Sequence, residues 1–163
     1  DQLVPNLNEP LQNSLLWVYE GQTQYYGLVL AARSGLMTRQ QALDVLAMSA
    51  ASFSHLPGRD WRALQDTTND PIVTQRRPQP WGSWQRNEDY YREGALIWLD
   101  ADTWIRQQSR GRRSPDDFAR AFYGRSGGSW DPIPFTFGEV VSTLNSVQAH
   151  DWGPFLRTRL DAL

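Results

Sequence analysis

The sequence of 163 residues contains no cysteine and no lysine, and all 16 of its basic residues are arginines. The absence of cysteine excludes disulfide bonds, thiolate zinc sites and cysteine nucleophiles. The absence of lysine excludes a Schiff-base lysine and the lysine of a phosphate-binding loop. No apolar run approaches the length of about 18 residues that a membrane span needs, and nothing in the sequence indicates a cellular compartment. The formal net charge of -2 argues against a broad nucleic-acid-binding surface.

Aromatic residues, in contrast, are abundant, with eight tryptophans, six tyrosines and six phenylalanines. A chain of this length is large enough to bury a sizeable core without covalent staples. Cap and turn residues divide it into about six predicted helices, and no convincing alternating segment indicates a strand. We therefore expect residues 1–163 to form one all-α unit.

The predicted helices differ in how clearly the sequence marks their ends. Thr38-Arg-Gln-Gln41 has the pattern of a capping box, in which the first and fourth residues cap each other, and Thr136-Phe-Gly-Glu139 is expected to open a later helix. Gly35 is well suited to end the first helix. The first helix is expected over residues 11–34, with Asn8 as N-cap and Pro10 in the first turn, and the second over 38–56. The third is expected over 87–109, with Glu88 and Asp89 in its first turn. Three shorter helices are expected to start at residues 114, 136 and 151.

The segment 57–86 has little periodicity. Compact domains rarely contain structureless loops longer than about 12–15 residues unless the loops serve a function. This segment holds Trp61, Trp81 and Trp84, which together with its prolines indicate an ordered coil packed on the helices. Such a coil forms either the wall of a pocket or a simple cover over the core.

Glu20 lies on a polar stripe of the first predicted helix, together with Thr23, Gln24 and Gly27. Gly21 and Gly27 each weaken a helix interior by about 1 kcal/mol relative to alanine. This cost indicates that something approaches the backbone closely at these positions. The alternative is a solvated face with ordinary glycine packing.

Tyr91 shares a stripe of the third predicted helix with Gly94 and Trp98, and this helix is apolar nearly all round after Gly94. A tyrosine in such a place usually packs its ring and hydrogen-bonds its hydroxyl group. Its hydroxyl group can also point at a reacting oxygen. The pattern leaves both roles open.

Two segments resemble those of a known enzyme family. Residues 16–26, which contain Glu20, resemble the segment of the glycyl aminopeptidases that supplies a glutamate zinc ligand, and these enzymes are gluzincin metallopeptidases. Residues 90–96 resemble the tyrosine segment of the same family, in which the tyrosine lies three residues before a glycine. The resemblance covers essentially the whole chain and includes residues 66–71, 81–86, 114–118 and 136–160.

The resemblance implies that the chain is the helical C-terminal subdomain of a thermolysin-like catalytic domain. Glu20 would be the third zinc ligand, and the phenol of Tyr91 would stabilise the oxyanion of the tetrahedral intermediate. Trp81 and Trp84 would line the substrate cleft. The intact enzyme would use Zn²⁺ to hydrolyse peptides with a small N-terminal residue, glycine preferred.

One part of the family's site is missing from these residues. A gluzincin needs the motif His-Glu-x-x-His, whose histidines bind zinc and whose glutamate acts as general base. The sequence lacks this motif, and His55 and His150 are isolated. We therefore expect a fragment of a larger catalytic domain, with the motif upstream and a PDZ-like module downstream. The fragment itself is expected to bind no zinc tightly, to be inactive, and to self-associate through the face that would meet the upstream half.

The alternative hypothesis is that the chain is not an enzyme but a helical module that binds a protein partner through its aromatic surface. Glu20 would then be a solvated residue with no role in metal binding. The upstream coding sequence discriminates between the two hypotheses, because a His-Glu-x-x-His motif there decides for the peptidase.

Overall fold

The computed structural model describes residues 6, 8–9, 11–74, 77 and 80–163, and these residues form helices and turns with no strand among them. The predicted all-α fold is confirmed. None of the helices in these ranges is both long and apolar enough to cross a membrane. The longer helices are α1 (Leu16–Arg33), α2 (Arg39–Ser54), α5 (Arg92–Ser109), α6 (Pro115–Tyr123), α7 (Phe137–Val147) and α8 (Trp152–Asp161). The short ones are η1 (Pro57–Asp60), α3 (Leu64–Thr67), α4 (Asp70–Val73) and η2 (Gly124–Ser126).

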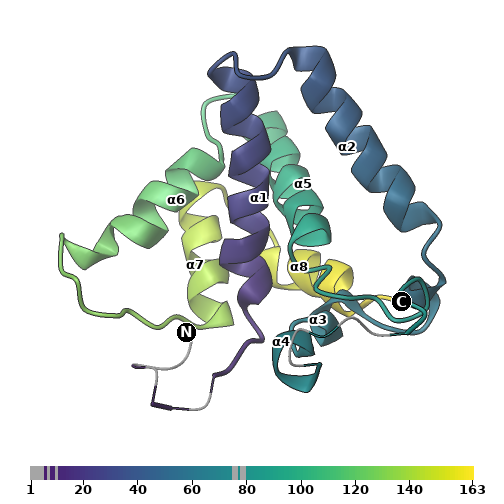
Figure 1. Cartoon of the computed structure of the whole chain (residues 1–163). Helices are drawn as coiled ribbons and strands as arrows, with labels where there is room; N and C mark the ends of the chain where they lie inside the picture. The colour runs from purple at the N-terminus through teal and green to yellow at the C-terminus, as the bar shows by residue number, and fades with distance from the viewer. Residues whose placement is uncertain (1–5, 7, 10, 75–76, 78–79) are drawn as a thin grey trace.

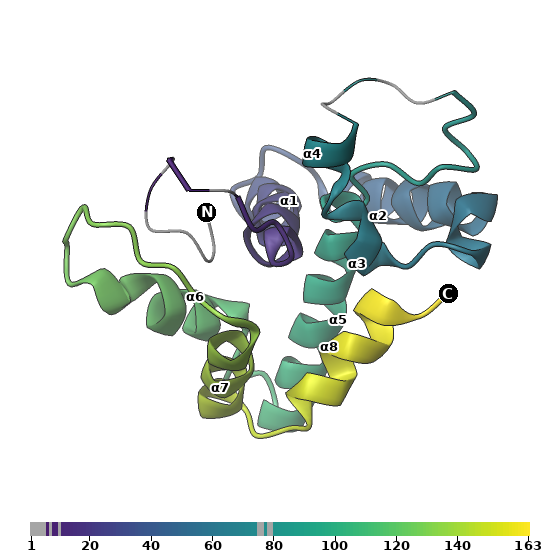
Figure 2. The same cartoon turned by 90° about the horizontal axis from the view of Figure 1, so that it is seen from below.

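Helix α1 stands in the middle of the molecule, with α6 and α7 on one side and α5 and α2 on the other (Figure 1). Helices α1 and α5 run in the same general direction and form the most extensive helix pair. Seen from below, α8 lies beside α5 (Figure 2), and Figure 1 shows α3 and α4 at the lower end of the molecule. The core contains large side chains from almost every long helix, among them Trp17, Trp98, Ile105, Phe118, Leu144 and Trp152.

The first helix starts later than the sequence predicts. The backbone N–H of Asn8 donates to the side-chain oxygen of Asn6 at 2.8 Å, so Asn8 belongs to a local turn and does not cap a helix. Helix α1 begins at Leu16, whose N–H donates to the carbonyl oxygen of Asn13 at 2.9 Å. The predicted position of Pro10 lies outside the described residues. At the other end, Gly35 follows α1 with a φ of 81°, as predicted.

The third predicted helix also starts later, at Arg92 instead of near Asn87. Glu88 adopts a φ of 46°, in the left-handed region, which a right-handed helix does not allow. Its N–H donates to the carboxylate of Asp70 at 3.2 Å instead of continuing a helix. Glu88 and Asp89 therefore precede α5, and Tyr91 stands at its N-cap position.

The predicted capping box at Thr38 is present, and the predicted helix start at Thr136 is a capping box as well. At the start of α2, the Thr38 hydroxyl accepts the N–H of Gln41 at 3.2 Å, and the Gln41 side chain accepts the N–H of Thr38 at 2.8 Å. Thr136 and Glu139 form the same reciprocal pair at α7. These short-range pairs need no tertiary contact, which is why the sequence predicts the starts of α2 and α7 correctly.

The segment 57–86 is predicted to be an ordered coil, whereas its described part, 57–74, 77 and 80–86, contains the short helices η1, α3 and α4. Helix α2 is less well packed than its apolar residues predict, because Phe53 is its one fully buried residue. Leu43 is 44% exposed and Met48 is 60% exposed. An apolar groove of about 750 Å³ therefore runs between α2 and the pair α1–α5.

Candidate active site

The helices α1 and α5 bring Glu20 and Tyr91 to the same contact. Glu20 directly precedes Gly21 in α1, and Tyr91 lies three residues before Gly94 in α5. A Cβ atom on Gly21 would lie 2.7 Å from the carbonyl carbon of Gly94, and a Cβ on Gly94 would lie 3.0 Å from the Cα of Gly21. The two backbones therefore touch at this point, and both partly buried candidate residues flank the contact.

The close approach expected at the two glycines of α1 is confirmed at Gly21 and wrong at Gly27. A Cβ on Gly27 would meet no atom within 4 Å, and the residue is exposed. At Gly21 the approaching group is the backbone of α5. Thr23 and Gln24, which share the polar stripe of Glu20, are exposed as well.

The phenol of Tyr19 lies close enough to both Glu20 and Tyr91 for each to affect its pKa. Burial raises the pKa of its phenol well above the ordinary value, and the Glu20 carboxylate raises it further through its charge and a hydrogen bond. The phenols of Tyr91 and Tyr90 add smaller contributions in the same direction. The rings of Tyr90 and Tyr91 in turn lie 4.8 Å apart. Tyr19 thus stays protonated near neutral pH, as a hydrogen-bond donor beside Glu20.

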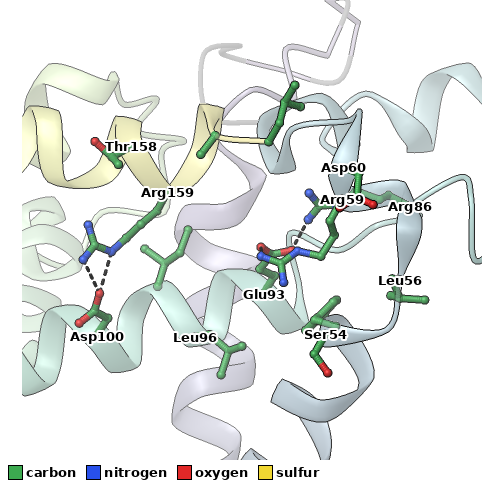
Figure 3. Close-up of a pocket in the computed structure, with 14 residues that line it drawn as sticks. Ser54, Leu56, Arg59, Asp60, Arg86, Glu93, Leu96, Asp100, Thr158 and Arg159 are labelled. Carbon is green, nitrogen blue, oxygen red and sulfur yellow. Dashed lines mark hydrogen bonds and ion pairs between the residues drawn. The ribbon is translucent and has the colours of Figure 1, made fainter.

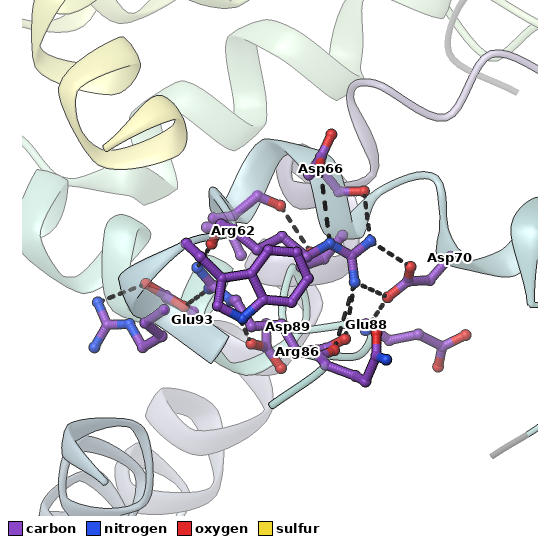
Figure 4. A network of polar contacts seen from close by, with 12 residues as sticks. Arg62, Asp66, Asp70, Arg86, Glu88, Asp89 and Glu93 are labelled. Atoms are coloured by element: carbon purple, nitrogen blue, oxygen red, sulfur yellow. Dashed lines mark hydrogen bonds and ion pairs between the residues drawn. The ribbon is translucent and has the colours of Figure 1, made fainter. Parts of the chain in front are cut away.

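A buried network of arginines and carboxylates, which the sequence analysis missed, holds the segment before Tyr91 (Figure 4). Arg62 donates to the carbonyl oxygen of Arg86 at 2.9 Å, and Arg86 donates back to the carbonyl oxygen of Arg62 at 2.8 Å. Arg62 also pairs with Asp70 at 2.6 Å. The two guanidinium groups therefore tie two distant parts of the long loop together.

Arg86 extends this network to the start of α5. Its guanidinium pairs with Asp89 at 2.8 Å and with Glu93, and Arg59 reaches Glu93 from the other side at 3.0 Å. Burial raises the pKa of Glu93, while Arg86 and Arg59 act in the opposite direction. Asp89 and Glu93 lie two residues before and two residues after Tyr91, so the network fixes the backbone on both sides of it. The arginine and acidic residues of the loop were the one sequence feature that could have indicated this network. Which of them pair with each other cannot be predicted from their order in the sequence.

The structure places Trp81 and Trp84 on the loop before α5, where they are 79% and 60% exposed. Trp81 has a φ of 57°, and the carbonyl oxygen of Trp84 accepts the indole N–H of Trp61 at 2.9 Å. Both indole rings thus lie largely in solvent on an ordered loop. Their contact with a substrate stays a prediction.

The two histidines lie away from each other. His55 is exposed at the end of α2, and His150 stacks on Trp104 with the ring centres 3.7 Å apart. Among the described residues, there is no group of three side chains that could hold a metal ion.

A cavity of about 530 Å³ lies between the end of α2, η1, α5 and α8 (Figure 3). Most of its charged side chains are paired with each other, Arg59 with Glu93 at 3.0 Å and Arg159 with Asp100 at 2.7 Å. We assign this cavity no role.

In the comparison with known protein families, residues 1–97 match the model of the M61 glycyl aminopeptidase family. The matched part is more than half of the chain and holds Glu20, Tyr91 and both glycines of the helix contact. No curated protein matches the chain.

Proposed function

This chain belongs to the M61 glycyl aminopeptidase family, and we propose that it forms the helical part of the catalytic domain of a zinc aminopeptidase. Glu20 binds the zinc ion in this proposal, and Tyr91 stabilises the transition state. The observation that supports the proposal is the contact of Gly21 with Gly94, because Glu20 directly precedes Gly21 and Tyr91 lies three residues before Gly94. Family membership favours this function over a non-enzymatic interaction module.

The chemistry of Glu20 suits one position in a zinc site. Zinc accepts a carboxylate oxygen beside imidazole nitrogens, and a hydrogen bond to such a carboxylate orients it. The neighbouring phenol of Tyr19 supplies that hydrogen bond. The two remaining protein ligands and the general base would come from a His-Glu-x-x-His segment upstream of these residues. When bound, the zinc ion supplies a nucleophile near neutral pH by lowering the pKa of a water molecule.

Tyr91 contributes a hydrogen bond that strengthens during the reaction. As the scissile carbonyl becomes tetrahedral, negative charge develops on its oxygen, and the phenol O–H of Tyr91 donates to this oxygen. A donor held in place beforehand stabilises the developing charge without a cost of reorganisation. The Arg86 network and the contact of α1 with α5 hold the backbone around Tyr91 in this way.

The proposed substrates are peptides with a small N-terminal residue, glycine preferred, with Trp81 and Trp84 on one wall of the cleft. The test is hydrolysis of glycyl, alanyl and leucyl p-nitroanilides by the intact zinc-loaded protein, with N-acetylglycyl p-nitroanilide as control. We expect the highest kcat/KM for the glycyl compound and no cleavage of the acetylated one. The proposal would be overturned if the protein cleaved none of the three free-amine substrates.

A further inference from the structure

We propose that the backbone contact between Gly21 and Gly94 positions Tyr91 relative to Glu20, so that Gly94 is a positioning residue of the active site. The inference rests on the proposed function, because it assigns a role to the spacing of the two residues to which that function gives the chemistry. It concerns residues that touch neither the metal nor the substrate.

The geometry of the contact sets a fixed spacing. A Cβ on Gly21 would come within 2.8 Å of the Cα and within 2.7 Å of the carbonyl carbon of Gly94, so the obstacle is backbone and not a flexible side chain. A helix backbone cannot turn aside as a side-chain tip can. Any larger residue at either position therefore has to push α1 and α5 apart. Glu20 and Tyr91, one residue and one helical turn away, would move with their helices.

Two further contacts keep the helices from sliding or rolling at this point. The indole N–H of Trp98, one turn after Gly94, donates to the carbonyl oxygen of Val18 at 3.1 Å. Farther along, the hydroxyl of Tyr25 donates to the carboxylate of Asp102 at 2.8 Å, and Arg106 holds the same carboxylate at 2.6 Å. All of these groups belong to α1 or α5, so these hydrogen bonds and the ion pair act within the two helices themselves.

The expected consequence is a loss in turnover with little change in substrate binding. A displacement of about 1 Å at a reacting group can slow a reaction by about 100-fold. Because Gly94 lies next to the transition-state donor and touches no substrate, a shift at this position should lower kcat and leave KM close to its original value. Zinc stays bound, since Glu20 and the other ligands remain.

The test is a double-mutant cycle in the intact zinc-loaded enzyme with Gly94→Ala and Tyr91→Phe. Its readouts are kcat, KM, zinc content and the Kd of a phosphinic peptide that mimics the tetrahedral intermediate. Gly153→Ala is the matched control, because a Cβ on Gly153, in α8, would meet no atom within 4 Å. We expect Gly94→Ala to lower kcat and weaken phosphinate binding by about tenfold or more. In the Tyr91→Phe variant, Gly94→Ala should change kcat and phosphinate binding by less than about twofold each, because the phenol hydroxyl that Gly94→Ala would displace is already absent.

The outcomes separate the inference from the proposed function. If Tyr91→Phe lowers kcat but Gly94→Ala costs the same in both backgrounds, the positioning role is overturned while the function of Tyr91 stands. If Tyr91→Phe leaves kcat unchanged, the proposed function itself fails. Should Gly94→Ala not fold, Trp98→Phe takes its place in the cycle, because it removes the hydrogen bond to Val18 without adding an atom at the contact.

Discussion

The indole N–H of Trp98 donates to the carbonyl oxygen of Val18 at 3.1 Å, which links α5 to α1 across 80 positions of the sequence. Both side chains are almost fully buried. The bond lies one helical turn from the place where Gly21 and Gly94 touch. The proposed catalytic residues thus border a tightly packed contact between two helices, and stability and function are expected to respond to the same substitutions.

Two glycines of α1 should respond to alanine in opposite ways. Gly21→Ala forces a methyl group against the backbone of Gly94 and should lower the free energy of unfolding by about 2 kcal/mol or more. Gly27→Ala meets no atom within 4 Å and should raise it by about 0.5–1 kcal/mol, through the higher helix propensity of alanine. Urea unfolding of the 163-residue chain, followed by circular dichroism, measures both. Equal effects of the two substitutions would contradict the close contact.

The Arg86 network should be costly to interrupt. Arg86→Met leaves the carboxylates of Asp89 and Glu93 without their main partner in a largely buried place, which should destabilise the chain by about 3–5 kcal/mol. Arg120→Met is the control, because the Arg120 side chain is 74% exposed in its pair with Asp117. This control should change stability by less than about 1 kcal/mol. A small effect of Arg86→Met would show that the loop is held by other contacts.

The capping box at the start of α7 predicts a dependence of stability on pH. The hydrogen bond from the backbone N–H of Thr136 is the largest influence on Glu139 and lowers its pKa. Burial acts in the opposite direction, and the Thr136 hydroxyl and Arg125 lower the pKa by smaller amounts. A pKa that is lower in the folded state adds stability above the unfolded-state value of about 4.3, and this stability is lost as the pH falls through the folded-state value. Wild type should therefore exceed Glu139→Gln in stability at pH 7, and the difference should shrink between about pH 5 and pH 3. A difference that does not vary with pH would contradict this account.

The isolated chain should neither hold zinc nor cleave peptides. Glu20 supplies one ligand in the proposed site, and the described residues contain no group of three side chains that could hold a metal ion. Metal analysis after dialysis should find far less than one zinc ion per chain, and glycyl p-nitroanilide should remain intact. Stoichiometric zinc together with peptidase activity in this chain alone would disprove the assignment of the remaining ligands to an upstream segment.

The features predicted correctly from the sequence are those that short-range contacts determine. The capping boxes at Thr38 and Thr136 close within four residues, and Gly35 ends α1 through its own left-handed conformation. The two wrong helix starts have tertiary or local causes that a periodic pattern does not contain. The backbone N–H of Asn8 donates to the side chain of Asn6, and the backbone N–H of Glu88 donates to the carboxylate of Asp70 instead of to a helical carbonyl oxygen.

The candidate site was predictable only in part for a similar reason. The glycine at position 21 indicated a close approach, but the partner, Gly94, lies in another helix, and the sequence does not show which backbone comes near. Likewise, the side chains of Arg62 and Arg86 donate to each other's backbone carbonyl oxygens. Every residue has a carbonyl oxygen, so the sequence does not indicate this interaction. The resemblance to the glycyl aminopeptidases supplied the roles of Glu20 and Tyr91, which composition and periodicity left open.

Zinc content, measured together with turnover in the intact protein, tests the central claim most directly. We predict that Glu20→Gln removes most of the bound zinc and that Tyr91→Phe keeps it while lowering kcat by about 100-fold or more. The control Glu139→Gln changes a glutamate of α7 that belongs to a capping box, and it should alter neither quantity. Full zinc content and full activity in Glu20→Gln would contradict the account.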